Sequence, residues 1–411
     1  MSTIRTAGVA PQSRSNLMDF RLAAALVAGN FAVVFISAML PTPLYPLYRE
    51  SFGFGGITLT VIYAVYVLGN MVAMVFFGRL SDQIGRRKVA ILAILSAVIS
   101  TLVFLFAEGT AWLYQARVLS GFATGLVAGS SAAWIAELYP AERRPTAALV
   151  ASAGNFMGVG LGPLMGGALA TFAPAPLHLS FVVYLCILAV SLLAIGAVPE
   201  TVPNAKTRWS DISLKPRFGV PAGIRMAFLS PGVTAFSIFS LIGFYGALIP
   251  GLVAGSLGVT SPLVSGSIVF ELFIVATITL ALSARLTPRT AMLSCLVLLP
   301  ASLWMLMLAE YLHSLGVVAL ATLIGGIAAA FGYRGSLQVV NAICPPDQRG
   351  EVVSVLMFCM FSGNAVPVIG ISVLAAATSP PIAHAVFAGV ITCFSVLAFV
   401  AGYRMLRPEK I

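Results

Sequence analysis

Charged side chains are scarce in this chain, because Asp, Glu, Lys and Arg together make up only 9% of its 411 residues. Hydrophobic residues make up 59% of the chain, and the mean hydropathy is +1.01. A water-soluble protein of this length needs far more polar side chains to cover its surface. The composition therefore excludes a soluble domain of useful size and indicates an integral membrane protein.

Histidine and cysteine are also scarce, with 3 and 5 residues. Cys186, Cys295, Cys344, Cys359 and Cys393 show no pairwise spacing, and so they indicate neither a disulfide framework nor a metal site. His178, His313 and His384 fall in predicted outer loops, where we expect solvated side chains. The dispersed histidines argue against a membrane enzyme. The chain also contains no G-x-x-x-x-G-K-[ST] sequence, which argues against an ATP-driven pump. We expect no catalytic residue, no metal and no cofactor.

Long apolar runs recur along the whole sequence, and about 20 apolar residues suffice for a helix to cross a bilayer. Their lengths predict twelve membrane-spanning helices, with ends uncertain by a few residues. The predicted spans are roughly 22–43, 57–77, 88–107, 111–136, 146–171, 178–198, 228–252, 262–283, 290–309, 314–340, 350–376 and 382–404.

The net charge of +10 follows the pattern of these spans. Of the 23 Lys and Arg residues, 20 lie in the termini and in the loops that share one side if the helices alternate. Arg49 alone lies on the other side, while Arg117 and Arg334 lie within spans. The positive-inside rule places both termini in the cytoplasm of a multi-pass plasma-membrane protein. The basic charge therefore reports topology, and we expect no nucleic-acid partner.

The longest hydrophilic stretch divides the predicted helices into six and six. Residues recur at an offset of 205 positions, as in the pairs Gly53 and Gly258, Gly121 and Gly326, and Gly158 and Gly363. An even number of helices in each half makes the two repeats parallel in the membrane. We predict an all-α fold with an N-terminal six-helix bundle at 1–198, a cytoplasmic central loop at 199–227 and a C-terminal six-helix bundle at 228–411. Two such halves enclose a central cavity and indicate an alternating-access transporter.

One short stretch, FFGRLSDQIGRRKV from Phe76 to Val89, concentrates charge between two apolar runs. Its glycines suit a tight loop, and its basic residues hold the loop in the cytoplasm. The stretch resembles the signature loop between helices 2 and 3 of the major facilitator superfamily, with Gln83 where the family usually has a basic residue. The resemblance covers essentially the whole chain. It also rests on Glu137, Pro140 and Arg144 after helix 4 and on Pro199 and Glu200 after helix 6.

Asp82 is the unusual member of this loop, because it is an acid between two glycines. In the superfamily fold this loop lies near the cytoplasmic start of helix 11, and a helix N-terminus stabilises a nearby carboxylate. We expect this pairing in one conformation only, so that the loop is a latch between the halves. The alternative is a purely topogenic basic loop. The other residues expected in the latch are Gly78, Gly85, Arg86, Arg87, Glu137 and Arg144.

Glycines recur every four residues in predicted helix 5, and such a stripe allows another backbone to approach closely. Part of this stripe resembles the antiporter motif of the superfamily, which is commonest in drug–proton exchangers, with Leu149 in place of an upstream glycine. The residues that carry this resemblance are Gly158, Gly162, Pro163, Gly166 and Gly167. The alternative is ordinary packing of small residues, which needs no antiport.

Three ionisable residues lie at membrane depth, where a charge costs roughly 3 kcal/mol or more and usually faces a cavity. Glu271 is the only acid well inside any predicted span, and we expect it to carry the coupled proton. Arg117 resembles the buried arginine motif of the superfamily, and Arg334 shares a helix face with Gln338. We expect both arginines to take part in proton coupling. The alternatives are a packing role for Glu271, a structural donor role for Arg117 and snorkelling of Arg334.

Aromatic and polar residues on the inner helices are expected to line the substrate cavity: Asn30, Tyr63, Tyr66, Asn70, Tyr245 and Gln338. Such a wall suits a partly apolar organic solute better than a sugar. Together with the resemblance to the twelve-helix drug–proton antiporters, it predicts a secondary transporter that exports small organic solutes or drugs. We expect a monomer in the lipid bilayer that is driven by protons. The alternative is a proton-coupled uptake symporter or a facilitator.

Overall fold

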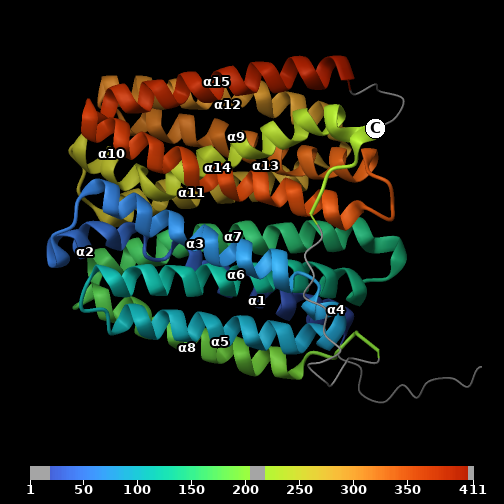
Figure 1. Cartoon of the computed structure of the whole chain (residues 1–411). Helices are drawn as coiled ribbons and strands as arrows, with labels where there is room; N and C mark the ends of the chain where they lie inside the picture. The colour runs from blue at the N-terminus through green and yellow to red at the C-terminus, as the bar shows by residue number, and fades with distance from the viewer. Residues whose placement is uncertain (1–18, 204–217, 406–411) are drawn as a thin grey trace, which may run out of the picture.

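The computed structural model describes residues 19–203 and 218–405, and it is all-helical within these ranges. Twelve of its helical stretches are long and apolar enough to cross a membrane. They run side by side in two groups, with the N-terminal half (blue to green) below the C-terminal half (yellow to red) in Figure 1. The predicted multi-pass helical membrane fold is therefore confirmed. Much of the predicted central loop, at 204–217, lies outside the described residues.

The N-terminal half contains six long helices and four short ones. They are α1 (Phe20–Met39), η1 (Thr42–Leu44), α2 (Tyr45–Phe52), α3 (Gly56–Phe77), α4 (Leu80–Ile84), α5 (Arg86–Leu105), α6 (Thr110–Leu138), η2 (Ala141–Arg143), α7 (Arg144–Phe172) and α8 (Pro176–Ala197). The first long helix ends at Met39, four residues before the end of the predicted span, because Pro41 and Pro43 lack the amide hydrogen that a continuing helix needs.

The C-terminal half repeats this order. Its helices are η4 (Ala222–Ile224), α9 (Arg225–Ala247), α10 (Ile249–Gly255), α11 (Pro262–Leu282), η5 (Ser283–Arg285), α12 (Pro288–Leu312), α13 (Leu315–Ile343), α14 (Arg349–Ala377) and α15 (Pro380–Met405). Shifting the bounds of α6 and α7 by 205 residues reproduces the bounds of α13 and α14. Gly53 and Gly258, which follow the short helices α2 and α10, have φ angles of 69° and 70°. Such angles favour glycine, and so the two halves share this backbone conformation at equivalent positions as well as the order of their helices.

The glycine stripe of α7 packs directly on α1. A Cβ atom at any of its four glycines would lie less than 3.0 Å from a carbonyl oxygen of α1. The facing pairs are Gly154 with Ala28, Gly158 with Ala32, Gly162 with Ile36, and Gly166 with Leu40. In the second half, Gly363 of α14 lies equally close to the backbone of α9 at Phe236. The close approach that the glycine spacing of helix 5 predicts is therefore confirmed, and the second half contains an equivalent contact.

The two halves meet through α7 against α11 and through α3 against α14. The aromatic ring of Phe156 in α7 lies 6.0 Å from that of Phe273 in α11 and 5.3 Å from that of Tyr333 in α13. Gly167 of α7 has no room for a Cβ atom, because the backbone of Pro262 in α11 occupies that space. The last glycine of the antiporter-like motif thus faces the other half, whereas Gly158, Gly162 and Gly166 face α1.

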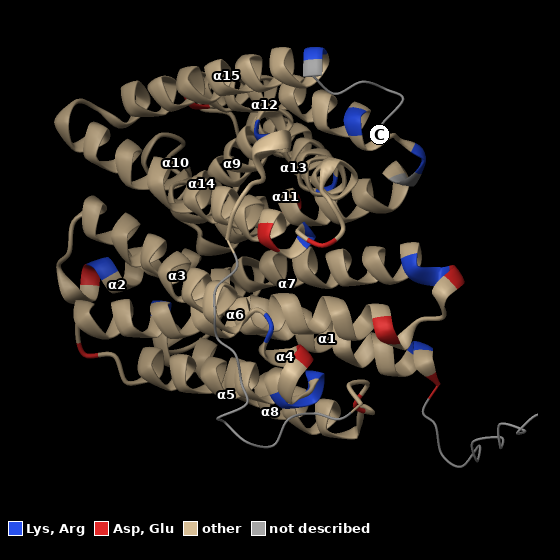
Figure 2. Cartoon of the chain, turned by 45° about the vertical axis from the view of Figure 1, so that its right-hand side comes forward, with Lys and Arg blue, Asp and Glu red and all other residues tan. Residues whose placement is uncertain are grey.

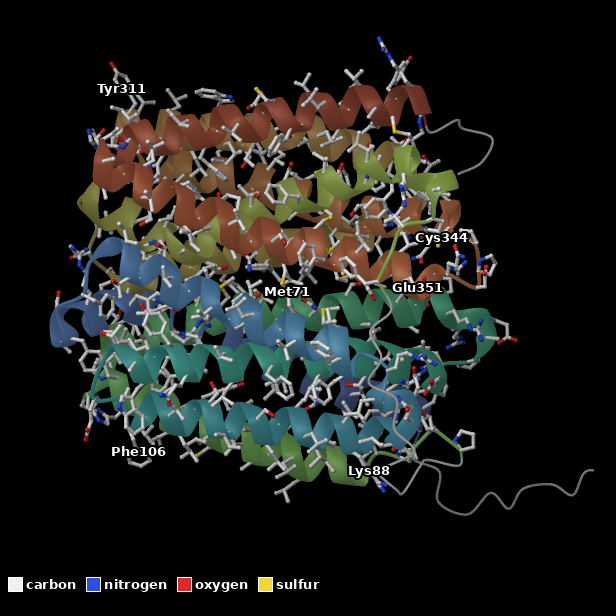
Figure 3. The ribbon with its side chains drawn as sticks, in the orientation of Figure 1. Met71, Lys88, Phe106, Tyr311, Cys344 and Glu351 are labelled. Atoms are coloured by element: carbon white, nitrogen blue, oxygen red, sulfur yellow. The ribbon has the colours of Figure 1, made fainter. Side chains whose placement is uncertain are left out.

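The two ends of the bundle differ in charge. Most Lys and Arg residues lie toward the end that carries α4, which we call the basic end (Figure 2). Lys88, Cys344 and Glu351 lie at this end in Figure 3, whereas Phe106 and Tyr311 lie at the other. We call this other end, which carries α2 and α10, the α2 end. The sorting of charge agrees with the alternation of helices that the sequence predicts.

Candidate functional site

Arg86 is the centre of a charged network at the basic end. Its guanidinium lies 2.5 Å from the carboxylate of Asp82, and it makes two hydrogen bonds of 2.7 and 3.2 Å to the carboxylate of Glu137. It also donates a 2.6 Å hydrogen bond to the hydroxyl of Ser81. Such bidentate, charge-assisted contacts are stronger than neutral hydrogen bonds. Because the Arg86 side chain is only 9% exposed, the network fixes the short helix α4 against α5 and α6.

Glu200 caps the helix that begins in this loop. Its carboxylate accepts hydrogen bonds of 2.9 and 3.0 Å from the backbone N–H groups of Arg86 and Arg87, at the first turn of α5. These amides have no partner within the helix, and their partial positive charge favours a carboxylate. Gly85 precedes them with a φ of 111°, and a Cβ atom there would collide with the Glu200 carboxylate. The glycine that the signature loop requires therefore leaves room for an acid 115 positions away.

Asp82 and the start of α14 face each other across a cavity of about 390 Å³ at the basic end. Its wall includes Asp82 on one side and Gly350, Glu351 and Ser354 on the other. The sequence therefore predicted the correct juxtaposition of the loop and helix 11, which is α14. In this conformation the carboxylate of Asp82 pairs with Arg86 of its own half. The role of the loop as a latch stays a prediction.

The two remaining basic residues of the predicted latch lie at the rim of this network. Arg87 donates a 3.4 Å hydrogen bond to the carbonyl of Gly196 at the end of α8. Arg144 begins α7 with an exposed side chain and makes no hydrogen bond or ion pair with the described residues. Gly78 ends α3 one turn before the network. The structure thus brings the loop residues, Glu137 and Glu200 together and leaves Arg144 apart.

Arg117 is fully buried in α6 without an acidic partner among the described residues. It donates hydrogen bonds of 2.6 Å to the carbonyl of Ala38 and 3.2 Å to the carbonyl of Tyr63. Its guanidinium carbon lies 4.7 Å from the ring centre of Tyr66 and 5.5 Å from that of Tyr63. Cation–π attraction of this kind is worth about 2 kcal/mol or more when the cation is desolvated. Two carbonyls and two aromatic rings therefore hold the positive charge of Arg117.

The same two tyrosines connect the halves. The hydroxyl of Tyr63 donates a 3.0 Å hydrogen bond to Oδ1 of Asn364 in α14, and Nδ2 of Asn364 donates a 3.3 Å hydrogen bond to the hydroxyl of Tyr66. All three side chains are buried. Asn364 was not among the predicted site residues. The signal that identifies it is a single carboxamide near the middle of an apolar span.

The other predicted cavity residues are held within their own halves. Asn30 of α1 accepts a 2.9 Å hydrogen bond from Ser191 of α8. Asn70 of α3 donates a 3.0 Å hydrogen bond to Thr124 of α6. Tyr245 of α9 and Thr322 of α13 share a 3.0 Å hydrogen bond, while Gln338 is half-buried in α13. Of the predicted set, only Tyr63 and Tyr66 hydrogen-bond across the interface, and a role in substrate binding stays a prediction for all of them.

Glu271 is half-buried near the middle of α11 and makes no hydrogen bond or ion pair with any described residue. Arg334 donates to the carbonyl and, at 2.9 Å, to the hydroxyl of Ser283, beyond the last residue of α11. Ser283 is roughly 18 Å from Glu271 along the helix axis, at 1.5 Å per residue. The structure therefore does not bring Arg334 to Glu271, and the arginine snorkels toward the basic end.

One prediction about histidine is wrong. His384 is 5% exposed, and its Nδ1 atom lies 3.0 Å from the carboxylate of Glu310, which also accepts a 2.7 Å hydrogen bond from Ser256. The residue is buried because α15 begins at Pro380 and its first turn packs against α12. His178 and His313 are exposed, as expected.

Two repeated bundles of membrane-spanning helices, packed against each other through α7 with α11 and α3 with α14, have the architecture of alternating-access transporters. The family model described as Major Facilitator Superfamily matches residues 27–367. The chain therefore belongs to the major facilitator superfamily, and it is a transporter and not an enzyme.

Two bacterial resistance proteins are similar to part of the chain. Multidrug resistance protein 2 of Bacillus subtilis is 26% identical over 147 residues, which are 36% of this chain and 37% of that protein. Quinolone resistance protein NorA of Staphylococcus aureus is 26% identical over 141 residues, which are 34% of this chain and 36% of that protein. The chain thus aligns with about a third of the length of these relatives.

Two solved structures share the fold along nearly the whole chain. The human organic anion transporter MFSD10 (TETRAN) superposes with a TM-score of 0.69 at 20% identity, over 94% of this chain and 100% of that one. A bacterial homologue of the human lysosomal transporter Spinster, inward-facing and unoccupied, has a TM-score of 0.69 at 16% identity, over 95% of this chain and 98% of that one.

Proposed function

We propose that the protein is a proton-coupled antiporter that exports small organic solutes across the plasma membrane by alternating access, with the basic end in the cytoplasm. The observation that carries the proposal is Glu271, an acid near the middle of α11 at the interface of the halves, with no hydrogen bond or ion pair to any residue that the structure describes. Its neighbours Phe270 and Phe273 pack against Gly160 of α7. The names of the two bacterial relatives, both resistance proteins, support export.

The coupling follows from the environment of a buried carboxyl group. Ionisation of such a group is unfavourable in an apolar site and favourable beside water or a cation. A rocking motion of the halves along α7 and α11 changes which side of the membrane supplies that water. Glu271 would take up a proton from the α2 end and release it at the basic end, and solute binding would compete with the proton. Because the protein then carries either the proton or the solute, but not both, the two move in opposite directions.

The test uses the full chain in lipid vesicles with an imposed pH gradient and a panel of fluorescent organic dyes, including ethidium. Glu271→Gln has nearly the shape of the protonated acid and does not titrate. We expect it to abolish uphill dye transport and to leave some downhill exchange. Glu142→Gln is the control, because Glu142 is an exposed acid in η2. Uphill transport at the wild-type rate by Glu271→Gln would exclude Glu271 as the proton carrier.

The direction of coupling separates the two candidate functions. An antiporter moves dye against the direction of proton flow. An uptake symporter moves dye with the protons, and a facilitator does not respond to the gradient. Proton flux measured with an entrapped pH-sensitive dye in the same vesicles distinguishes these three outcomes.

A further inference from the structure

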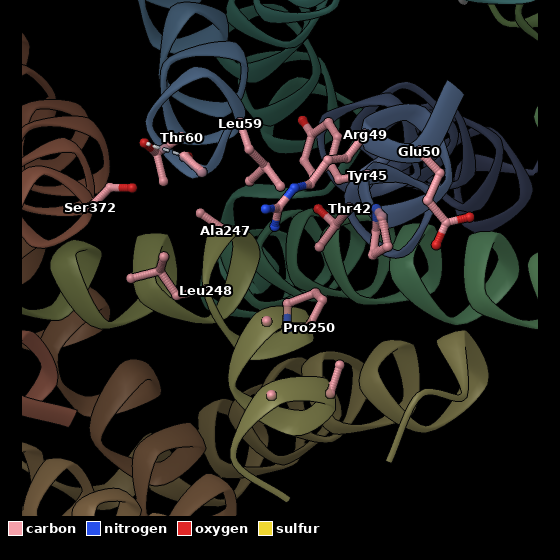
Figure 4. A pocket seen from close by; sticks show the side chains of 15 residues that line it. Thr42, Tyr45, Arg49, Glu50, Leu59, Thr60, Ala247, Leu248, Pro250 and Ser372 are labelled. Carbon is pink, nitrogen blue, oxygen red and sulfur yellow. Dashed lines mark hydrogen bonds between the residues drawn. The ribbon is translucent and has the colours of Figure 1, made fainter. Parts of the chain in front are cut away.

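A cavity of about 660 Å³ lies between the two halves at the α2 end (Figure 4). One wall comes from η1, α2 and the start of α3, and the other comes from the end of α9, from α10 and from Ser372 of α14. Binding sites for drug-sized ligands occupy about 300–1,000 Å³. The cavity is therefore large enough for an organic solute, and it draws on both halves.

Most of the cavity wall is apolar. Leu59 covers the N-terminal side, and Ala247, Leu248 and Pro250 cover the C-terminal side. The hydroxyl of Thr60 is directed to the backbone of its own helix, with hydrogen bonds to the carbonyls of Gly56 and Ile57. Such a wall suits an aliphatic or aromatic body and offers little to a sugar or another polyol.

One charge points into this apolar space. In Figure 4 the guanidinium of Arg49 reaches between Thr42, Leu59 and Ala247, whereas the carboxylate of Glu50 points away from them. The side chain of Arg49 makes no hydrogen bond or ion pair with the described residues. A guanidinium presents a planar fork of donors that fits a carboxylate or a sulfonate. The cavity therefore combines an apolar wall with an unpaired anion-binding group.

The position of Arg49 has a partial structural explanation. It lies in the last turn of α2, where a cation is favourable beside the free carbonyl groups of a helix C-terminus. That effect accounts for a basic residue at this position in the sequence. The helix C-terminus does not explain the direction of the side chain. Because Arg49 is exposed, its side chain could extend into solvent, yet it extends into the cavity between the halves.

We propose that this cavity binds amphipathic organic anions, with the apolar body against Leu59, Leu248 and Pro250 and the anionic group on Arg49. Under the proposed function, on which its place in transport rests, the cavity is the outer site of the export path. A solute that reaches it from the centre of the protein exchanges apolar contacts for solvent while the guanidinium still holds its charged group.

The test measures binding without any gradient. Ala254 lines the cavity and is half-buried, so Ala254→Cys provides a site for a membrane-impermeant maleimide in the full chain in lipid nanodiscs. Mass spectrometry of the labelled position separates it from the native cysteines. The probes share one ring and differ in charge: 1-naphthalenesulfonate, 1-naphthylmethanol and 1-naphthylmethylammonium. Each is titrated for protection of the introduced cysteine.

We expect the sulfonate to give half-protection at about a tenth of the concentration of the alcohol, as for one charge-assisted hydrogen bond, and the ammonium to protect least. Arg49→Gln should remove the preference for the sulfonate, whereas Arg49→Lys should keep part of it and Glu50→Gln all of it. An unchanged labelling rate without probe shows that Arg49→Gln leaves the cavity intact.

Two results overturn the proposal: equal protection by the three probes, which includes protection by none, and an undiminished sulfonate preference in Arg49→Gln. Glu271→Gln should leave the protection unchanged, because Glu271 does not line this cavity. Failure of the proton-coupling proposal is therefore distinguishable from failure of this one.

Discussion

Tyr63 of α3 and Asn364 of α14 form a 3.0 Å hydrogen bond across the interface of the two halves, and the same carboxamide donates to Tyr66. Both tyrosine rings also lie beside the buried guanidinium of Arg117. Tyr63, which joins the halves, therefore also contacts the buried guanidinium of Arg117. Separation of α3 from α14 breaks both hydrogen bonds, so this cluster opposes opening toward the α2 end.

The first prediction concerns this cluster. Asn364→Leu keeps the branched shape of the side chain and removes both hydrogen bonds, each worth about 0.5–1.5 kcal/mol net. We expect the α2 end to open more often. Thr60 is 1% exposed and lines the cavity there, so Thr60→Cys should react with an impermeant maleimide about tenfold faster in the Asn364→Leu protein.

Tyr63→Phe supplies the matched control for that experiment. It should raise the labelling rate in the same direction, and the double variant should show less than the sum of the two effects, because the pair shares one interaction. Additive effects, or an unchanged labelling rate in Asn364→Leu, contradict a role of this hydrogen bond in closing the α2 end.

The charged loop gives a prediction in which two acids behave differently. Asp82→Asn should keep the fold and slow dye transport, because Asp82 is half-exposed and faces the start of α14 across the cavity at the basic end. Glu137→Gln removes a partner of the buried Arg86 and should lower the free energy of unfolding by about 1 kcal/mol. Vesicle flux and thermal unfolding in detergent measure the two effects. Normal transport by Asp82→Asn would contradict the role of Asp82 in a latch between the halves.

The buried pair of Glu310 and His384 predicts a stability effect in the C-terminal half. Removing one partner of a buried hydrogen bond leaves the other polar group unsatisfied, which costs about 1–3 kcal/mol, whereas replacing both partners by apolar residues is often close to neutral. We expect Glu310→Leu to lower the unfolding temperature clearly and the double variant with His384→Leu to recover most of the loss. A double variant less stable than Glu310→Leu would contradict this account. The unfolding temperatures of the purified wild type, single variant and double variant distinguish the two outcomes.

The fold was predictable from sequence because membrane-spanning helices are set by local properties. Apolar length gave the twelve spans, and the glycine spacing indicated which faces pack closely. The repeat was visible because residues with special backbone geometry recur, as Gly53 and Gly258 do. None of these signals depends on knowing which distant helices touch.

The polar contacts were less predictable, because they depend on long-range packing. His384 was expected in solvent, because it lies at the outer end of a predicted span, and only the packing of α15 on α12 brings it to Glu310. Asn364 gives no pattern with Tyr63, which lies 301 positions earlier. Arg334 has a periodic relation to Gln338, but its hydrogen bonds run to Ser283 beyond the end of α11. Sequence spacing shows which residues share one face of a helix, but it does not show which other helix packs against that face.

The last prediction concerns the glycine stripe of α7. Gly158→Leu places a branched side chain where the backbone of Ala32 in α1 leaves no room even for a Cβ atom, and such overpacking costs about 1–3 kcal/mol or more. We expect the protein to insert in the membrane, to unfold at a lower temperature and to lose dye transport. Gly370→Leu is the matched control, because Gly370 of α14 is exposed and has nothing within 4 Å of its Cβ position. The control should insert, unfold and transport as the wild type does. Because α1 and α7 belong to the same half, a loss of stability in Gly158→Leu identifies a defect within the N-terminal bundle. Full stability together with full transport in Gly158→Leu would show that α7 does not need its contact with α1.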